Sequence, residues 1–198
     1  NLMDVEGMDA LTKAVRAYST ERPDDPLLFA SCIDYHVIEG RAATRHELDR
    51  VMPDRPFAAM AADHHTVWAN TRALEMAGLL HGGDLPEGSE VVMADDDTAH
   101  GELRETGAFG PVMALTRLGG RDLEGYVTGR NPDPPATLAE RAMDKQVIAK
   151  GMKHCASHGI TGLHLMDGNF YQGELLSEMD ADGTLLCRSE VPMHLKNI

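Results

Sequence analysis

The chain contains 198 residues, and its 32 acidic against 18 basic side chains give it a formal net charge of -14 at pH 7. Nucleic-acid binding normally needs a basic stripe, and a membrane-spanning helix needs about 20 consecutive apolar residues; this sequence shows neither. Its 42% hydrophobic and 25% charged residues are typical of a soluble globular protein.

The cysteines suggest a cellular compartment for the protein, and the first residue suggests that the chain is part of a longer one. Cys32, Cys155 and Cys187 cannot all pair and show no CxxC spacing, which favours a reducing compartment such as the cytoplasm. The chain starts at Asn1 and shows no secretory signal pattern. We therefore expect a cytoplasmic location, and we expect the chain to be an internal piece of a longer protein.

The first part of the chain predicts helices and strands in alternation. Thr44 and Glu47 have the spacing of a capping box, and Asn70 is placed to cap a later helix. Apolar spacing and Gly or Pro punctuation give the limits of each element. In chain order they are a helix over 7–19, a strand over 27–33, a short helix from 44 to 53, a strand over 56–61 and a helix from 70 to 78.

The rest of the chain begins with long loops and ends in a second α/β series. Gly and Pro punctuate residues 80–101 and 119–135, so we expect a loop-rich insertion over 80–136 within a single segment, 1–198. The other elements are a weak helix over 105–117, a long helix from a capping box at Thr137 to Gly159, a strand over 160–166, a helix over 171–179 and a strand over 185–193. About four strands alternating with helices predict an α/β fold with an unfinished parallel sheet.

Two histidines are candidates for chemistry because each lies in or after a predicted strand. His65, beside His64, follows the strand over 56–61, at the end where α/β folds place binding and catalytic groups. His164 lies within the strand over 160–166, and Asp167 directly follows that strand. A neutral imidazole can bind a metal or a substrate, but a hydrogen-bonded structural histidine is the ordinary alternative at both positions.

Glu105 is a third candidate, at a junction between a loop and a predicted helix. A carboxylate there could act in a site, and it would also interact favourably with the helix dipole. From the residues alone, the second explanation is sufficient.

Five segments, taken together, show order and spacing that resemble a known family. They are Thr44–Asp49 with Pro53–Pro56, Ala62–Gly78, Thr98–Glu105, His158–His164 and Cys187–Arg188. They resemble the amidohydrolase-3 branch of the amidohydrolase superfamily, which includes YtcJ-like metal-dependent hydrolases and formamide deformylases. The similarity covers nearly the whole chain, and the segment around Asn70 is its most specific part.

The resemblance implies a partial (β/α)8 TIM-barrel hydrolase with a divalent metal, usually zinc, that splits a C–N bond in an amide or cyclic amide through metal-activated water. It implies catalytic roles for His65 and Glu105, and substrate contacts by His65, Asn70 and His164. Glu105 and His164 are the candidate metal ligands. The implied partners are a small amide substrate and either the remainder of the barrel or a second copy, as in a homo-oligomer.

The sequence also departs from the family's pattern. The H-x-H metal pair of the first barrel strand is absent, the later His and Asp ligands do not follow, and His64 replaces a glycine. We therefore expect this chain to be inactive alone. The alternatives are a non-catalytic fragment or interaction module, and an independent acidic α/β domain whose histidines bind metal weakly.

Overall fold

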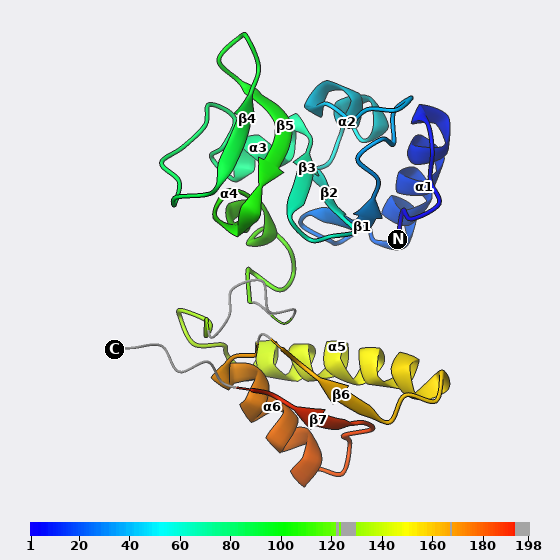
Figure 1. The fold of residues 1–198 in the computed structure, drawn as a ribbon, viewed down its shortest axis with the longest axis vertical. Helices are drawn as coiled ribbons and strands as arrows, with labels where there is room; N and C mark the ends of the chain where they lie inside the picture. The colour runs from blue at the N-terminus through cyan, green and yellow to red at the C-terminus, as the bar shows by residue number, and fades with distance from the viewer. Residues whose placement is uncertain (122, 124–129, 167, 193–198) are drawn as a thin grey trace. The chain divides into compact units, whose positions relative to one another are not determined.

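The computed structural model describes residues 1–121, 123, 130–166 and 168–192. The chain divides into two compact units, Asn1–Gly120 and Arg121–Ile198, which are described separately (Figure 1). None of the helices in the described residues is both long and apolar enough to cross a membrane.

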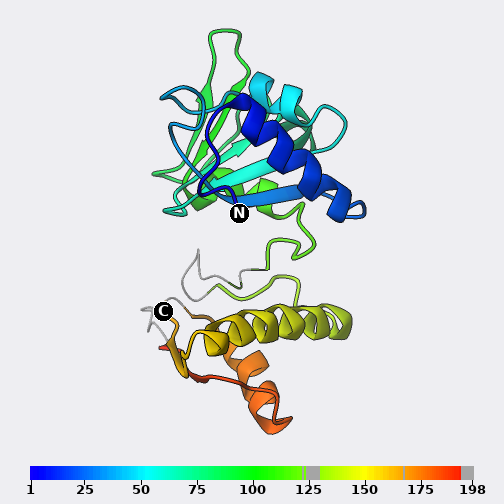
Figure 2. The same ribbon diagram turned by 90° about the vertical axis from the view of Figure 1, so that its right-hand side faces the viewer.

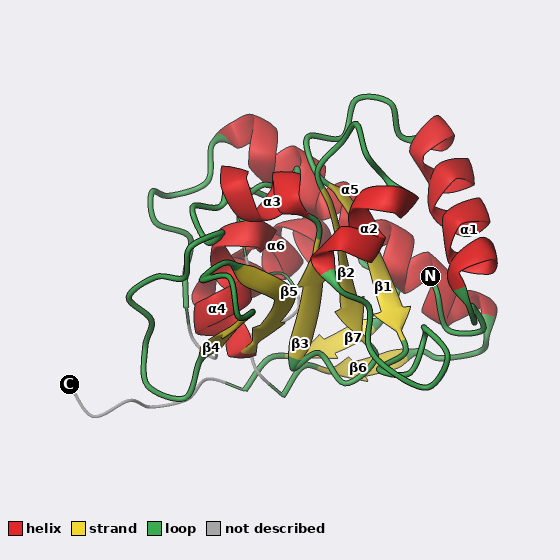
Figure 3. Cartoon of the chain, turned by 90° about the horizontal axis from the view of Figure 1, so that it is seen from above, coloured by secondary structure: helices red, strands yellow, loops and turns green. Residues whose placement is uncertain are grey.

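The first unit is built on a five-stranded sheet with the order β1-β2-β3-β5-β4, whose strands lie side by side in Figure 3. β1 and β2 are parallel, whereas the other neighbouring pairs are antiparallel. It follows that β1, β2 and β5 run in the same direction. The strands are β1 (Leu28–Ile33), β2 (Phe57–Ala61), β3 (Thr66–Ala69), β4 (Glu90–Met93) and β5 (Ala99–Arg104).

Four helices accompany this sheet: α1 (Met8–Glu21), α2 (Arg45–Val51), α3 (Thr71–Met76) and α4 (Glu105–Met113). α1, drawn in blue, lies in front of the sheet in Figure 2 and packs against α2. Leu11 of α1 and Leu48 of α2 are fully buried in one core with Phe57 of β2 and Trp68 of β3. All five residues of β2 are buried, so this strand contributes to the core along its whole length.

The predicted capping box at the start of α2 is confirmed. The Thr44 side chain accepts from the Glu47 backbone N–H, and the Glu47 carboxylate accepts from the Thr44 N–H at 2.9 Å. Glu47 also accepts two hydrogen bonds from the Arg41 guanidinium, at 2.6 and 2.9 Å. The bonds from Arg41, together with those from Thr44, lower the pKa of Glu47 to about 2.

This depressed pKa predicts an acid-sensitive contribution to stability. The contribution is present above the ordinary glutamate pKa of 4.5 and is lost as the pH falls towards about 2, because the ionised form is favoured only in the folded state. We expect Glu47→Gln to lower the free energy of unfolding by about 1–2 kcal/mol at pH 7 and by much less at pH 2. The value at pH 7 is modest because Arg41 is exposed and solvent weakens its interaction with Glu47. Urea unfolding at both pH values checks this, and an equal cost at both would contradict it.

The second unit contains α5 (Leu138–Ser157), β6 (Gly162–His164), α6 (Phe170–Ala181) and β7 (Arg188–Glu190). β6 and β7 pair in parallel as a two-stranded sheet. Met152, Met179 and Cys187 form the small apolar core with Leu176. The predicted capping box at Thr137 and the end of the long helix near Gly159 are confirmed.

The structure corrects the predicted parallel sheet. The four expected strands correspond to β1, β2, β6 and β7, and they pair in parallel as β1 with β2 and β6 with β7. They do not form one parallel sheet, because β3, β5 and β4, which were not predicted, join β1 and β2 in a five-stranded, mostly antiparallel sheet. A (β/α)8 TIM barrel is not confirmed, and no closed barrel exists among the described residues. Residues 80–136, expected to be loop-rich, contain β4, β5 and α4.

The missed strands have a common physical reason. β3 and β4 are only four residues long, too short to show an alternating pattern, and Pro86 and Gly88 lie in the turn before β4. The predicted strands over 160–166 and 185–193 shorten to the three-residue β6 and β7. The end of the latter prediction, from Met193, lies outside the described residues.

Candidate active-site edge

Three strands of the first unit end at the same edge of the sheet. Because β1, β2 and β5 run in one direction, the segments that follow them lie together: Tyr35 after β1, His65 after β2 and Glu105 after β5. The Glu105 N–H donates to the His65 carbonyl at 2.9 Å, which joins two of these segments directly. We call these residues, with Asp63 and Thr66, the candidate active-site edge.

At this edge His65 and Glu105, predicted separately as catalytic, lie in contact. His65 Nδ1 lies 3.2 Å from Glu105 Oε1 and 3.3 Å from Oε2. Both side chains are largely exposed, at 67% and 48%. An ionised carboxylate only accepts, so the hydrogen bond requires a proton on Nδ1 and, in the neutral ring, leaves Nε2 as a base.

The backbone at this edge is strained at two side-chain-bearing residues. His64 has φ 66° and Glu105 has φ 62°, in the left-handed region that favours glycine. His64 occupies the position where the family resemblance places a glycine, so the structure keeps the glycine-like conformation without the glycine. Such strain costs about 1–3 kcal/mol per residue and concentrates at functional sites.

Asp63 and Tyr35 support the turn that carries His65. Asp63 Oδ1 accepts from the His65 backbone N–H at 3.1 Å. The Tyr35 hydroxyl lies 3.2 Å from Asp63 Oδ2 and 2.8 Å from Thr66 Oγ1. The Tyr35 ring packs edge-on against the Trp68 ring, with the two ring centroids 4.9 Å apart. Burial is the main cause that raises the pKa of Tyr35, so it keeps its proton at neutral pH.

Tyr35 and Asp63 were not singled out from the sequence. Tyr35 closely follows the first strand, and Asp63 stands directly beside His64. His65 was selected because it follows a strand that is expected to be parallel. The same criterion applies to Tyr35 and Asp63. What the sequence could not show is that β5 would bring Glu105 to the same edge.

Asn70, predicted to contact the substrate, lies in the core and holds neighbouring backbone groups. It is fully buried. Its Oδ1 accepts from the N–H groups of Phe57 and Ala73, both at 3.0 Å. Its Nδ2 donates to the carbonyls of Met52 and Arg55 at 3.0 and 2.9 Å. These four bonds use the whole hydrogen-bonding capacity of the amide, so no group remains for a substrate.

His164 lies in β6 of the second unit, whereas His65 and Glu105 lie in the first. It is exposed, and its Nδ1 lies 3.8 Å from Glu190 Oε2 on the neighbouring strand β7. A paired surface histidine is the role that the described contacts support. Asp167, the other candidate in this region, lies outside the described residues.

The donors grouped in the described residues are too few for the metal site that the family resemblance implies. Among the described residues, no three His, Cys, Asp or Glu side chains are grouped so that they could hold a metal ion. Catalytic zinc usually takes three protein ligands, whereas His65 and Glu105 supply two and are hydrogen-bonded to each other. The described residues therefore do not fit a complete metal centre.

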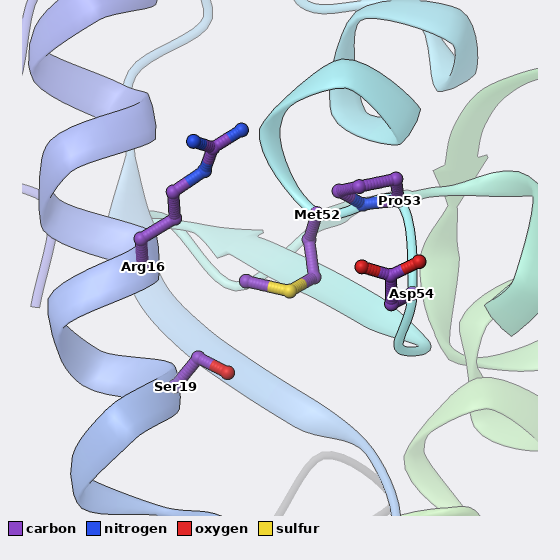
Figure 4. A pocket seen from close by; sticks show the side chains of 5 residues that line it. All are labelled: Arg16, Ser19, Met52, Pro53 and Asp54. Atoms are coloured by element: carbon purple, nitrogen blue, oxygen red, sulfur yellow. The ribbon is translucent and has the colours of Figure 1, made fainter.

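A cavity of about 360 Å³ lies at the other end of the strands. It is lined by Arg16 and Ser19 of α1 and by Met52, Pro53 and Asp54 of the segment between α2 and β2 (Figure 4). This segment precedes β2, and Arg55 next to it donates to the Ser19 carbonyl at 3.1 Å. The cavity contains none of the predicted site residues and lies where α/β folds place stabilising contacts.

Comparisons with known proteins agree with the resemblance. "Putative amidohydrolase YtcJ" of Bacillus subtilis (strain 168) is 26% identical over 128 residues, which is 65% of this chain and 20% of that protein. The N-substituted formamide deformylase of Arthrobacter pascens is 37% identical over 75 residues, 37% of this chain and 14% of the relative. The chain thus matches a fifth or less of the length of each curated relative.

Two solved structures share the fold. They are uncharacterized metal-dependent hydrolases from Pyrococcus horikoshii OT3, with TM-score 0.55 and 16% identity, and from Pyrococcus furiosus, with TM-score 0.52 and 17% identity. The alignments cover 97% and 96% of this chain and 32% of each neighbour. The model of the amidohydrolase family (Amidohydro_3) matches residues 1–194, and the chain belongs to this family.

Proposed function

We propose that this chain forms part of a metal-dependent hydrolase that splits the C–N bond of an amide or cyclic amide, and that the candidate active-site edge faces the substrate. Family membership and the similarity to a formamide deformylase support the reaction class. The single observation that carries the proposal is the contact between His65 Nδ1 and Glu105, at 3.2 Å.

In this proposal Glu105 orients the imidazole and stabilises its charged form, and His65 moves protons through Nε2. Nε2 accepts a proton as water adds to the carbonyl carbon. It returns that proton to the nitrogen as the C–N bond breaks and the amine leaves. Asp63 holds the turn by its bond to the His65 N–H, so the ring keeps its position between the two transfers.

The metal ligands and the rest of the active site would come from outside the described residues. A divalent metal, with zinc as the expected ion, would need ligands beyond the donors grouped among the described residues. Residues 1–198 would act as one segment of the hydrolase and depend on the remainder of the barrel or on a second copy. The three cysteines are free, which supports a cytoplasmic setting. We expect the 198-residue chain to be inactive alone.

The test uses the protein as its gene encodes it. Hydrolysis of N-substituted formamides and cyclic amides is measured by release of the amine or by ring opening, with the metal content determined in parallel. His65→Gln and Glu105→Gln are each expected to lower kcat by about 100-fold or more, with a smaller change in KM. His46→Gln is the matched control, since His46 also lies beside a carboxylate, that of Asp49 at 3.9 Å.

A non-catalytic interaction module is the second candidate, because the described residues contain no group of three metal ligands. An encoded protein that binds no divalent metal and hydrolyses none of these amides would favour that candidate. If hydrolysis is present but His65→Gln leaves kcat unchanged, the reaction class stands and the role of His65 is wrong.

A further inference from the structure

The C-terminal end of α5 carries two histidines that the proposed reaction does not use. His154 and His158 are four residues apart, so they lie one turn apart on the same face. Their ring centroids are 4.6 Å apart, with the planes at 53°. Both residues are exposed, at the point where the chain turns back from α5 towards β6 (Figure 1).

The hydrogen bonds of His158 fix which of its ring nitrogens is a ligand. Nδ1 lies 2.9 Å from the His154 backbone oxygen and 3.1 Å from Ser157 Oγ. The Ser157 hydroxyl donates its own proton to the same His154 oxygen at 2.7 Å, so towards Nδ1 it is an acceptor. A carbonyl oxygen only accepts, so Nδ1 carries the proton and, in the neutral ring, Nε2 carries a lone pair. Histidines that bind metals are commonly oriented in this way, with the second ring N–H donated to a carbonyl.

We propose that His154 and His158 chelate a divalent ion of the late first transition row: Cu²⁺, Ni²⁺ or Zn²⁺. Imidazole nitrogen suits these ions, and two histidines one helical turn apart form a recurrent ligand pair. With metal–nitrogen distances of about 2.1 Å and a tetrahedral angle, the two nitrogens lie about 3.4 Å apart. The ring centroids are now 4.6 Å apart, and we expect rotation of the His154 side chain, which leaves the His158 hydrogen bond in place, to bring the two nitrogens to this separation.

The surroundings set the strength of the site. The negative end of the α5 dipole attracts a cation, whereas the exposed Lys150, one helical turn before His154, opposes it. Within the described residues no third His, Cys, Asp or Glu joins the pair, so water completes the coordination and the ion exchanges readily. The site lies in the second unit and does not depend on the proposed function.

The test titrates the ¹⁵N-labelled full chain with NiCl₂, ZnCl₂, CuCl₂ and MgCl₂ in separate experiments. Long-range ¹H–¹⁵N imidazole spectra follow each of the ten histidines. His154 and His158 are expected to respond first and together, Cu²⁺ is expected to bind more tightly than Ni²⁺ or Zn²⁺, and Mg²⁺ is expected to have no effect. Equal responses of all exposed histidines would overturn the proposal.

Single-histidine variants distinguish chelation by both rings from binding to one ring alone. His154→Gln and His158→Gln are each expected to lower the Ni²⁺ association constant by about tenfold or more. His46→Gln should leave it unchanged, since His46 is exposed on α2 with Arg50 one turn further on. An unchanged constant in either single variant refutes chelation, and so does loss of Ni²⁺ binding in Cys155→Ser. Hydrogen exchange of the α5 amides verifies that each variant keeps the helix.

Discussion

Asn70→Ala is expected to lower the free energy of unfolding of the first unit by about 3–5 kcal/mol, far more than the loss of a helix cap costs. The substitution removes four hydrogen bonds in a fully buried position. It leaves the N–H of Phe57, which starts β2, and the carbonyls of Met52 and Arg55 without these partners. One side chain thus connects the end of α2, the start of β2 and the start of α3.

The measurement is urea unfolding followed by fluorescence of Trp68, because the only tryptophan of the chain lies in the first unit. Thr44→Ala is the matched control: among the described residues the Thr44 side chain bonds only to Glu47, within the first turn of α2, so the loss of unfolding free energy should be about 1 kcal/mol. Asn70→Asp should also be costly, since a carboxylate would face the two carbonyls to which the amide donates. Equal costs for Asn70→Ala and Thr44→Ala would refute the bridging role.

The second large effect is expected at Asp144, the fully buried carboxylate of α5. Its oxygens accept from Arg121 Nε at 2.6 Å, from Arg121 Nη2 at 2.8 Å and from the Tyr171 hydroxyl at 2.6 Å. The Arg121 side chain is only 6% exposed. Asp144→Ala would leave this guanidinium buried without its main counter-charge, so we expect a loss of about 3–5 kcal/mol in the second unit.

Hydrogen exchange of the α5 backbone amides measures this loss, because it reports on the second unit by itself. Tyr171→Phe removes only the hydroxyl bond and should cost about 1–2 kcal/mol. Asp180→Ala, at an exposed carboxylate of α6, should change little. A small effect of Asp144→Ala would mean that Glu140, 2.8 Å from Arg121 Nη1, compensates for the missing charge.

Helix ends were the most predictable part of the fold. Thr44 with Glu47, Thr137 with Glu140, and Asn70 all cap helices as their spacing predicts, because capping depends on residues within one turn. β3, by contrast, was missed although it lies between two correctly predicted elements. Its four residues carry too little periodicity, and its pairing with β5 joins residues far apart in the sequence.

The candidate residues divide in the same way. The sequence by itself determined that His65 follows a strand, that Glu105 begins a helix and that Asn70 caps one, because each property is local. Only the tertiary structure decided that β5 runs parallel to β2 and brings Glu105 to within 3.2 Å of His65, and that burial leaves Asn70 no free hydrogen-bonding group. The charge of -14 and the lack of long apolar runs limited the class of protein, but side-chain chemistry depends on distances between segments. Those distances are set by burial and by pairing between strands that are far apart in the sequence. No short sequence pattern predicts either of them.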